Sequence, residues 1–437
     1  MGRSMRQQNR IAIICGSLAQ AGTERYVYEL CRALDKTRFA VDLLTIAPWG
    51  VGRQYYAEPI RQCGIAIRPI LPLFHWRRLP KLLRRYALAG QEVYRSWLLP
   101  KLLAHYDLVI VVQLDYLSDV AFMLPPDTTV LLHLTTHLCQ HEPNYYRNKY
   151  PGDRAVFLVC MDRCQAQQAQ EGLGSVIRGQ TVVPLPIDVS GFEEITEWSS
   201  STHPIIGSFM RIEPDRDHMP LLRAFAILAK ESDAELRCYG RGDASFLEAE
   251  AIRLGVGGRV KFPGHVTDIR RTVIDDHIAL AWLTAHDDFM GYAGIELGLW
   301  GVPTYFYNVI GTMSVQAILR QTAGTVHSYS SEAELAQASL ALLRNPGLLR
   351  EEGRRLRQYV QWHNDSKHVV RQIESFYEEV LQGTRCNPRT NLSASQVAGV
   401  AGDLSVFATG GSDGRARGQT LPGRRTDEGC GHSRAPG

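Results

Sequence analysis

Short apolar runs alternate with segments of helical periodicity along most of this chain of 437 residues. In the first half, the apolar runs at residues 10–17 and 107–113 are typical of strands, whereas apolar positions in residues 23–36 recur at helical spacing. The alternation begins again near residue 205. Continuous apolar runs suit strands that are covered on both faces, and their alternation with helices favours parallel, doubly wound sheets. We therefore predict an α/β protein with two Rossmann-like domains that face a cleft.

A polar, Ser-rich stretch at residues 191–204 predicts a linker between these two domains. The predicted N-terminal domain covers residues 1–190, and the predicted C-terminal domain covers residues 205–365. A final helical pattern occupies residues 366–383. Residues 384–437 are rich in Gly, Ser and Arg and show no periodicity, which predicts a disordered tail.

The charge balance argues against a nucleic-acid partner. The formal net charge is +3, and the seven Arg and four acidic residues from position 384 onward account for all of it. A nucleic-acid-binding protein would show a larger basic excess.

The nine Cys are scattered without a C-x-x-C pair, which is typical of reduced thiols. No apolar stretch approaches the ~18 residues that span a bilayer, so we expect a cytoplasmic protein.

One basic amphipathic segment runs from Trp76 to Tyr86. It holds five basic residues and no acid, with Leu at helical spacing. Such a helix could dock on the anionic inner face of a membrane or hold a phosphate-bearing acceptor. The alternative is an ordinary amphipathic helix with a solvated basic face.

The stretch at residues 286–306 places two carboxylates around a glycine. Asp288 lies in a loop after an apolar strand, and Glu296 lies in the helix that starts near Gly291. A helix N-terminus suits phosphate, and glycine lets a ligand approach the backbone. Glu296 could accept hydrogen bonds from a ribose diol, and Asp288 could meet sugar hydroxyls. The alternatives are a solvated helix residue and a helix cap, but an acid in so apolar a helix usually has a partner.

Two arginines follow the first strand of the second half. Arg211 and Arg216 could bind a diphosphate with two hydrogen bonds each. The alternative is that they pair on the surface with the neighbouring acids Glu213, Asp215 and Asp217. Gly240 follows another strand, which is a weak indication of close nucleotide approach.

The first half carries weaker indications of a site. The loop at residues 15–25 contains Gly16 and Gly22 but lacks the G-x-G-x-x-G pattern, so a nicotinamide site is not favoured. His133 is the first of three His at spacings of four, which could bind a metal if all lay on one helix. Because His133 ends an apolar run that we interpret as a strand, we predict no metal site. We expect His133 to face the cleft as a polar active-site group, and the alternative is a core histidine with its hydrogen bonds satisfied.

Several segments together resemble the GT-B retaining glycosyltransferases of the family 4 group. A-G-T-E-R at residues 21–25 is similar to that family's G-G-x-E-R, and V-V-P-L-P-I-D at residues 182–188 is similar to V-P-N-G-I-D. D-F-M-G-Y-A-G-I-E-L-G-L-W-G-V-P at residues 288–303 resembles E-G-F-G-x-x-x-x-E-A-M-A-x-G-x-P. The segments at residues 207–230 and 259–282 also resemble that family, and the resemblance extends over residues 11–381.

This resemblance implies roles for particular residues. Arg211 and Arg216 would bind the donor diphosphate, Glu296 the ribose and Asp288 the donor sugar. His133 would lie near the reacting sugar. The remaining residues that the resemblance places around the donor are Gly16, Gly22, Gly240, Phe289, Met290 and Gly291. The final helix would cross back to the N-terminal domain, as in GT-B proteins generally.

The implied function is a retaining, hexosyltransferase-type glycosyltransferase of polysaccharide biosynthesis, without a metal or other cofactor. Its donor would be a nucleotide-diphosphate sugar and its acceptor a glycan, a lipid-linked molecule or another acceptor. Five positions depart from the family pattern: Asp288 replaces Glu, Phe289 and Asp217 replace Gly, and residues 185–186 replace Asn-Gly. These departures leave open a catalytically inactive GT-B protein that binds a nucleotide sugar or scaffolds glycan assembly. An epimerase or a phosphorylase is a third alternative.

Overall fold

The computed structural model describes most of the chain between residues 8 and 386. The described residues are 8–46, 54–70, 97, 99–113, 124, 128–135, 145–150, 154–195, 203–214, 217–309, 311 and 313–386. All of them belong to one unit, residues 1–399. Several features predicted above lie outside them: the segment from Trp76 to Tyr86, residues 196–202 of the linker, Asp215, Arg216, and the tail from residue 387 onward.

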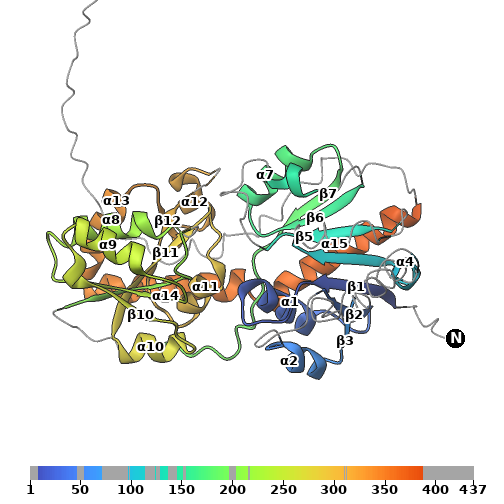
Figure 1. Cartoon of the computed structure of the whole chain (residues 1–437), viewed down its shortest axis with the longest axis horizontal. Coiled ribbons are helices and arrows are strands. Elements are labelled where there is room, and N and C mark those ends of the chain that lie inside the picture. The colour runs from blue at the N-terminus through green and yellow to red at the C-terminus, as the bar shows by residue number, and fades with distance from the viewer. Residues whose placement is uncertain are drawn as a thin grey trace, which may run out of the picture. The chain divides into compact units, whose positions relative to one another are not determined.

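The first sheet is parallel and has seven strands in the order β3-β2-β1-β4-β5-β6-β7 (Figure 1). Its strands are β1 (Asn9–Cys15), β2 (Phe39–Thr45), β3 (Ala66–Pro69), β4 (Leu108–Val112), β5 (Val130–His133), β6 (Val156–Cys160) and β7 (Ile177–Val182). The described helices of this half are α1 (Gly22–Ala33), α2 (Ala57–Gln62), α4 (Leu99–Leu103), α6 (Tyr145–Lys149) and α7 (Arg163–Leu173).

The second sheet repeats this design with six parallel strands in the order β10-β9-β8-β11-β12-β13. Its strands are β8 (Ile205–Phe209), β9 (Glu235–Tyr239), β10 (Val260–Gly264), β11 (Ile278–Ala285), β12 (Thr304–Asn308) and β13 (His327–Tyr329). Its helices are α8 (His218–Leu228), α9 (Ser245–Arg253), the 3₁₀ helix η5 (Gly257–Arg259), α10 (Ile269–Asp275), α11 (Gly291–Leu299), α12 (Val315–Gln321), α13 (Glu332–Leu343) and α14 (Pro346–His363). The prediction of two Rossmann-like sheets is therefore confirmed.

The central strands of each sheet are buried on both faces, which explains the continuous apolar runs. In β1, Ile11 and Ile13 pack in one core cluster, whereas Ala12 and Ile14 pack in another on the opposite face. The first of these clusters continues through residues 183–195 to one face of the second sheet. A third cluster covers the other face of the second sheet, beneath α8, α9 and α13. Successive side chains of a strand point to opposite faces, so a doubly covered strand is apolar at most of its positions.

The last helix, α15 (Ser366–Cys386), packs against the first sheet although it follows the second in sequence. Tyr377 lies edge-on to Phe39, with ring centroids 6.0 Å apart. Glu374 pairs with Arg38 at 2.7 Å and accepts a hydrogen bond from the backbone N–H of Asp35 at 2.6 Å. The chain thus returns to its N-terminal half through both apolar and ionic contacts.

Glycines bring α14 close to the C-terminal end of α11. A Cβ atom added at Gly353 of α14 would overlap the carbonyl oxygen of Gly301. One added at Gly298 of α11 would lie 3.0 Å from Val360 and 3.1 Å from Leu356. The helix that bears Glu296 is therefore fixed by backbone-to-backbone packing that a larger residue would prevent.

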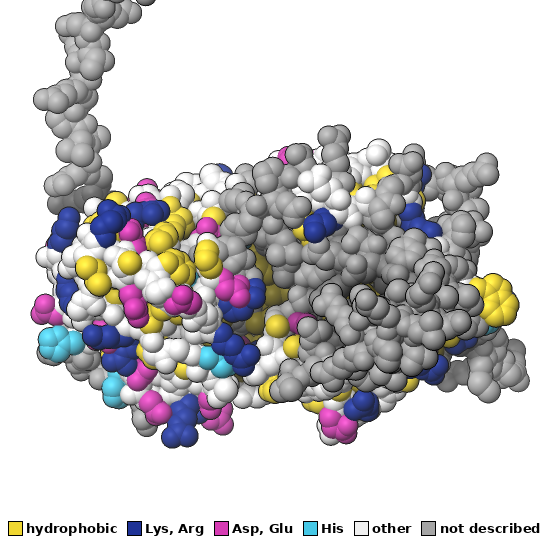
Figure 2. Space-filling view, viewed as in Figure 1, with side chains coloured by type: hydrophobic (Ala, Val, Ile, Leu, Met, Phe, Trp, Pro, Cys, Tyr) yellow, Lys and Arg dark blue, Asp and Glu magenta, His cyan; other side chains and the backbone are white. Residues whose placement is uncertain are grey.

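On the face of the second half that Figure 2 shows, acidic and basic side chains are interspersed. Several form pairs, such as Arg223 with Glu332 and Arg237 with Asp276, each at 2.9 Å. Among the described helices, none is both long and apolar enough to cross a membrane.

We expect Gly353→Ala to destabilise the protein, because the new methyl group must displace the backbone at Gly301. Overpacking of this kind costs about 1–3 kcal/mol, which a lower urea midpoint would reveal. Gly258→Ala is the matched control, since an added Cβ there meets no atom within 4 Å. Equal midpoints for the two variants would contradict this account of the packing.

Candidate functional site

Each of the two sheets has a topological switch point, which is where doubly wound proteins bind their ligands. In the first sheet β1 lies between β2 and β4, and in the second β8 lies between β9 and β11. The connections on either side of such a strand run in opposite directions, which opens a crevice at the carboxyl ends of the strands. The loops after β1 and β11 lead into α1 and α11, and these two helices carry the residues that meet between the sheets.

Helix α11 begins directly after the β11 loop, as predicted. Gly291 has a φ of +62°, a conformation that favours glycine, and no atom lies within 4 Å of a Cβ built there. Among the described residues, no side chain caps the first turn of the helix. Met290 and Phe289 point into or against the apolar core. The helix therefore offers backbone N–H groups at an open glycine, which is an arrangement suited to an anion.

Glu296 on α11 forms an ion pair with Arg25 on α1. The guanidinium group of Arg25 also lies 4.8 Å from the ring centroid of Tyr292 and 3.9 Å from the carboxylate of Glu29. The side chains of Glu296 and Arg25 are 16% and 22% exposed, so water screens their attraction only in part. The sequence correctly indicated that Glu296 has a partner. It did not identify that partner as Arg25, which belongs to the other half of the chain.

The contacts of Arg25 continue into the segment after β7. Arg32 lies 3.3 Å from Glu29 and 2.7 Å from Asp188, whose backbone N–H donates to Glu29 at 3.2 Å. The hydroxyl of Tyr292 donates to the carbonyl of Pro186 at 3.1 Å. One ionic and aromatic network therefore joins α1, α11 and the segment that connects the two sheets.

Asp288 lies in the β11–α11 loop and is held by Gln321, whose Nε2 donates to Oδ2 at 3.0 Å. Its side chain keeps some exposed surface, yet protein surrounds the carboxyl group. Burial, reinforced by the carboxylates of Asp162 and Asp287, raises the pKa of Asp288 to about 7, and Arg163 opposes the rise. A carboxyl group that titrates near neutrality is typical of functional sites.

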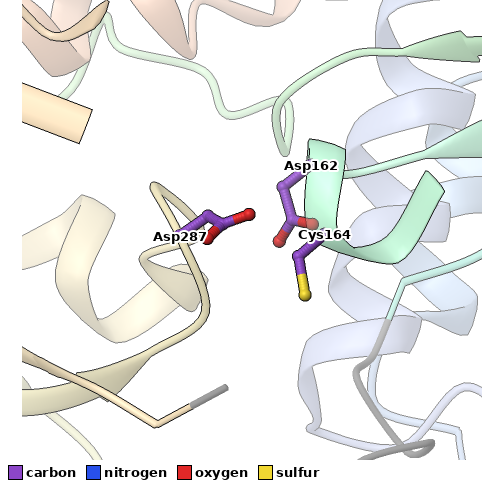
Figure 3. Close-up of side chains that lie close together, drawn as sticks. All are labelled: Asp162, Cys164 and Asp287. Carbon is purple, nitrogen blue, oxygen red and sulfur yellow. The ribbon is translucent and has the colours of Figure 1, made fainter. Parts of the chain in front are cut away.

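Asp162, Cys164 and Asp287 are buried together between the two halves, with their donor atoms within 4.8 Å of one another (Figure 3). Asp162 caps α7 by accepting from the N–H of Gln165 at 2.7 Å. Carboxylate and thiolate groups are metal donors, so this cluster could hold a cation. Each of the three also interacts with other groups of the chain. Sequence reasoning missed the cluster because Asp287 lies more than 100 residues beyond Asp162 and Cys164.

His133 lies in the core and not on an open surface. Its side chain is fully buried, the hydroxyl of Tyr26 lies 2.6 Å from Nδ1, and the hydroxyl of Tyr377 lies 3.1 Å from Nε2. Burial lowers its pKa to about 3. This arrangement matches the alternative of a satisfied core histidine, because α15, which follows the second sheet in sequence, covers the ring.

The remaining predicted residues divide between surface and backbone roles. Arg211 is more than half exposed and pairs with Glu213 at 3.1 Å, as the surface alternative has it. A Cβ at Gly240 would overlap the carbonyl oxygen of Met210, so close packing of the chain against itself explains this glycine. Gly16 follows β1 directly, and a Cβ at Gly22 would touch Tyr292 at 3.9 Å. Gly22 thus lies where the two halves meet.

A polar cluster that sequence reasoning missed lies at the carboxyl edge of the first sheet. Nε2 of Gln113 donates to the hydroxyls of Thr23 and Thr135, at 3.0 and 2.6 Å. Gln113 directly follows β4 and has a φ of +84°, which is uncommon for a residue other than glycine. The cluster ties the first turn of α1 to the ends of β4 and β5.

Comparison with known proteins identifies the fold. No protein family model and no curated protein matches the chain. HepE of Anabaena in complex with UDP and glucose matches with a TM-score of 0.59 and 15% identity, over 85% of this chain and 100% of that one. Sucrose-phosphate synthase from Thermosynechococcus elongatus matches with 0.61 and 14%, over 86% and 100%. A mutant O-GlcNAc transferase of Thermobaculum terrenum matches with 0.58 and 17%, over 87% and 68%.

These solved structures are GT-B glycosyltransferases. At such low sequence identity the likeness is one of fold. The chain has the GT-B fold. Its two parallel sheets with flanking helices, joined through residues 183–195 and α15, account for the match over most of the chain.

We expect the Arg25–Glu296 pair to show energetic coupling in a double-mutant cycle with Arg25→Met and Glu296→Gln. Partly shielded partners in contact couple by about 0.5–3 kcal/mol, which urea unfolding of the four proteins would measure. The pair Arg271–Asp275, whose side chains are 78% and 61% exposed, is the control and should couple by less than about 0.5 kcal/mol. Equal coupling in both cycles would mean that the Arg25–Glu296 pair contributes no more than an exposed surface pair.

We expect the free energy of unfolding to decrease as the pH is lowered below about 6.5, in part because His133 is buried in its neutral form. The pKa of His133 is lowered to about 3 in the native protein. Between about pH 6.5 and this value, the unfolded chain therefore binds a proton at His133 that the native protein does not bind. The contribution of neutral His133 to the free energy of unfolding is complete above about pH 6.5, the pKa of His in the unfolded chain. Below that pH it decreases by up to about 1.4 kcal/mol per pH unit. His133→Gln should flatten the fall in Tm between pH 6.5 and 4, and an unchanged slope would count against the assignment.

Proposed function

We propose that this protein is a glycosyltransferase that moves a sugar from a nucleotide-diphosphate donor to a glycan, lipid-linked or other acceptor. The observation that carries the proposal is the position of Glu296. It lies on the helix that starts at the carboxyl end of β11, at the switch point of the second sheet, and faces α1 of the first. A carboxylate at that position is suited to accept hydrogen bonds from the ribose of a nucleotide.

The donor fits this region group by group. The open N-terminus of α11 at Gly291 suits a phosphate. Arg25 engages only Oε1 of Glu296, and Oε2 has no hydrogen-bond partner in the described part of the chain, so a ribose hydroxyl can bind there. Asp288 lies eight residues earlier, in the loop, where hydroxyls of the transferred sugar would reach it. Arg211 and Arg216 would then neutralise the leaving diphosphate.

The finer features of the reaction belong to the same proposal. We expect a retaining hexosyltransferase of the family 4 type that acts in polysaccharide biosynthesis in the cytoplasm, with residues 76–86 as a contact to the inner face of the membrane. HepE has been solved with UDP-glucose, and a mutant of S. aureus TarM has been solved with Fondaparinux, alpha-GlcNAc-glycerol and UDP. These complexes support a nucleotide sugar and a glycan as substrates here.

A thermal-shift screen against UDP, GDP, ADP, dTDP and their common sugars tests the donor site. A ligand that binds the native state stabilises it by mass action and so raises the Tm. At a ligand concentration of 100 times the Kd, the stabilisation is about 2.7 kcal/mol. We expect one nucleotide to stabilise the protein and Glu296→Ala to abolish the shift. Glu248→Ala, an exposed acid on α9, is the matched control. No shift with any nucleotide would remove the basis of the proposal.

Arg211→Ala should slow the release of free sugar from the donor about 100-fold, because one preorganised donor to a developing negative charge contributes about 3 kcal/mol. Lys230→Ala, an exposed cation after α8, should leave the rate unchanged. Unchanged turnover by Arg211→Ala would exclude this arginine from the diphosphate site.

EDTA tests the proposed metal independence. We expect it to change neither binding nor turnover. Asp162, Cys164 and Asp287 could hold a cation, and residues 215–217 read Asp-Arg-Asp, the spacing of a D-x-D motif. A loss of turnover that Mg²⁺ or Mn²⁺ restores would overturn metal independence without affecting the donor site.

A further inference from the structure

Helix α12 is tied at both ends to the two acidic residues of the β11 loop. At its start, the N–H of Met313 donates to Oδ1 of Asp287 at 3.0 Å. At its end, Nε2 of Gln321 donates to Oδ2 of Asp288 at 3.0 Å. Because α12 follows β12, the neighbour of β11 in the sheet, these bonds hold Gln321 beside the carboxyl edge of the second sheet.

The other polar atom of Gln321 is left without a partner. Oε1 is buried and accepts no hydrogen bond from any described residue. Oδ1 of Asn308, at the end of β12, is in the same condition. Asn308 ends β12 and Gln321 ends α12. Between them, Gly311 packs against the side chains of Asn308 and Asp287. A buried acceptor without a donor costs about 1–3 kcal/mol, so in native proteins such an atom is usually completed by an ordered water or by a ligand.

We propose that Gln321 is a specificity-determining residue of the donor site, whose Oε1 accepts a hydrogen bond from a hydroxyl of the transferred sugar while its Nε2 positions Asp288. This inference rests on the proposed function. Asp288 and Gln321 present two acceptors on neighbouring side chains, which fits two hydrogen-bond donors on neighbouring sugar carbons. The site therefore selects a sugar with a vicinal diol, because a deoxy sugar would leave one buried acceptor unpaired.

The test compares the wild-type protein and Gln321→Met with the nucleotide sugar found in the screen and with its monodeoxy analogues. Methionine has a similar length but offers no such acceptor. We expect one deoxy analogue to lower kcat/KM for release of free sugar about 10-fold or more in the wild type. Gln321→Met should lose a similar factor with the parent donor and nothing further with that analogue. The Kd for the nucleoside diphosphate alone should not change.

Gln316→Met is the matched control, because Gln316 is an exposed residue of the same helix, and it should discriminate like the wild type. Discrimination by Gln321→Met equal to that of the wild type would overturn the inference while the proposed function stood. If no deoxy analogue reacts more slowly with the wild type, the inference fails even without the variant. If the wild type binds no nucleotide, the proposed function fails and this inference fails with it.

Discussion

The contact between Arg25 and Glu296 is the interaction on which the candidate site depends. It joins a helix of the first sheet to a helix of the second, and the ring of Tyr292 and the carboxylate of Glu29 support the guanidinium group. A partly buried ion pair must offset the loss of hydration of both charges, so it contributes only when its geometry is held by further contacts. Here those contacts extend to the segment at residues 186–188, which links the halves.

Packing fixes the helix that bears Glu296 from its other side. Gly298 and Gly353 allow α11 and α14 to approach, and α14 leads directly into α15, which packs on the first sheet. The apolar core that covers one face of the second sheet continues to one face of the first. The position of Glu296, the candidate ribose-binding residue, thus follows from an apolar core shared by both sheets and from a few charged side chains around it.

The carboxylates of Asp162, Asp287 and Asp288 lie in mutual repulsion near this contact, since each of the first two raises the pKa of the third. Proteins rarely bury like charges without a functional reason. Hydrogen bonds from the Gln321 side chain and from the N–H of Met313 to two of these carboxylates order the β11 loop and α12 together. Oε1 of Gln321 and Oδ1 of Asn308 are buried there without a hydrogen-bond partner among the described residues, which is the observation behind the proposed role of Gln321.

The sequence by itself determined the two parallel sheets, because strands buried on both faces require continuous apolar runs that can be recognised without knowledge of their partners. It also determined where α11 begins, since the left-handed backbone at Gly291 needs glycine, and that Glu296 needs a partner. Only the tertiary structure decided that the partner is Arg25, that α15 covers His133, that Gly240 serves backbone packing, and that Gln321 holds Asp288. These contacts join residues tens to hundreds of positions apart, and local periodicity carries no information about them.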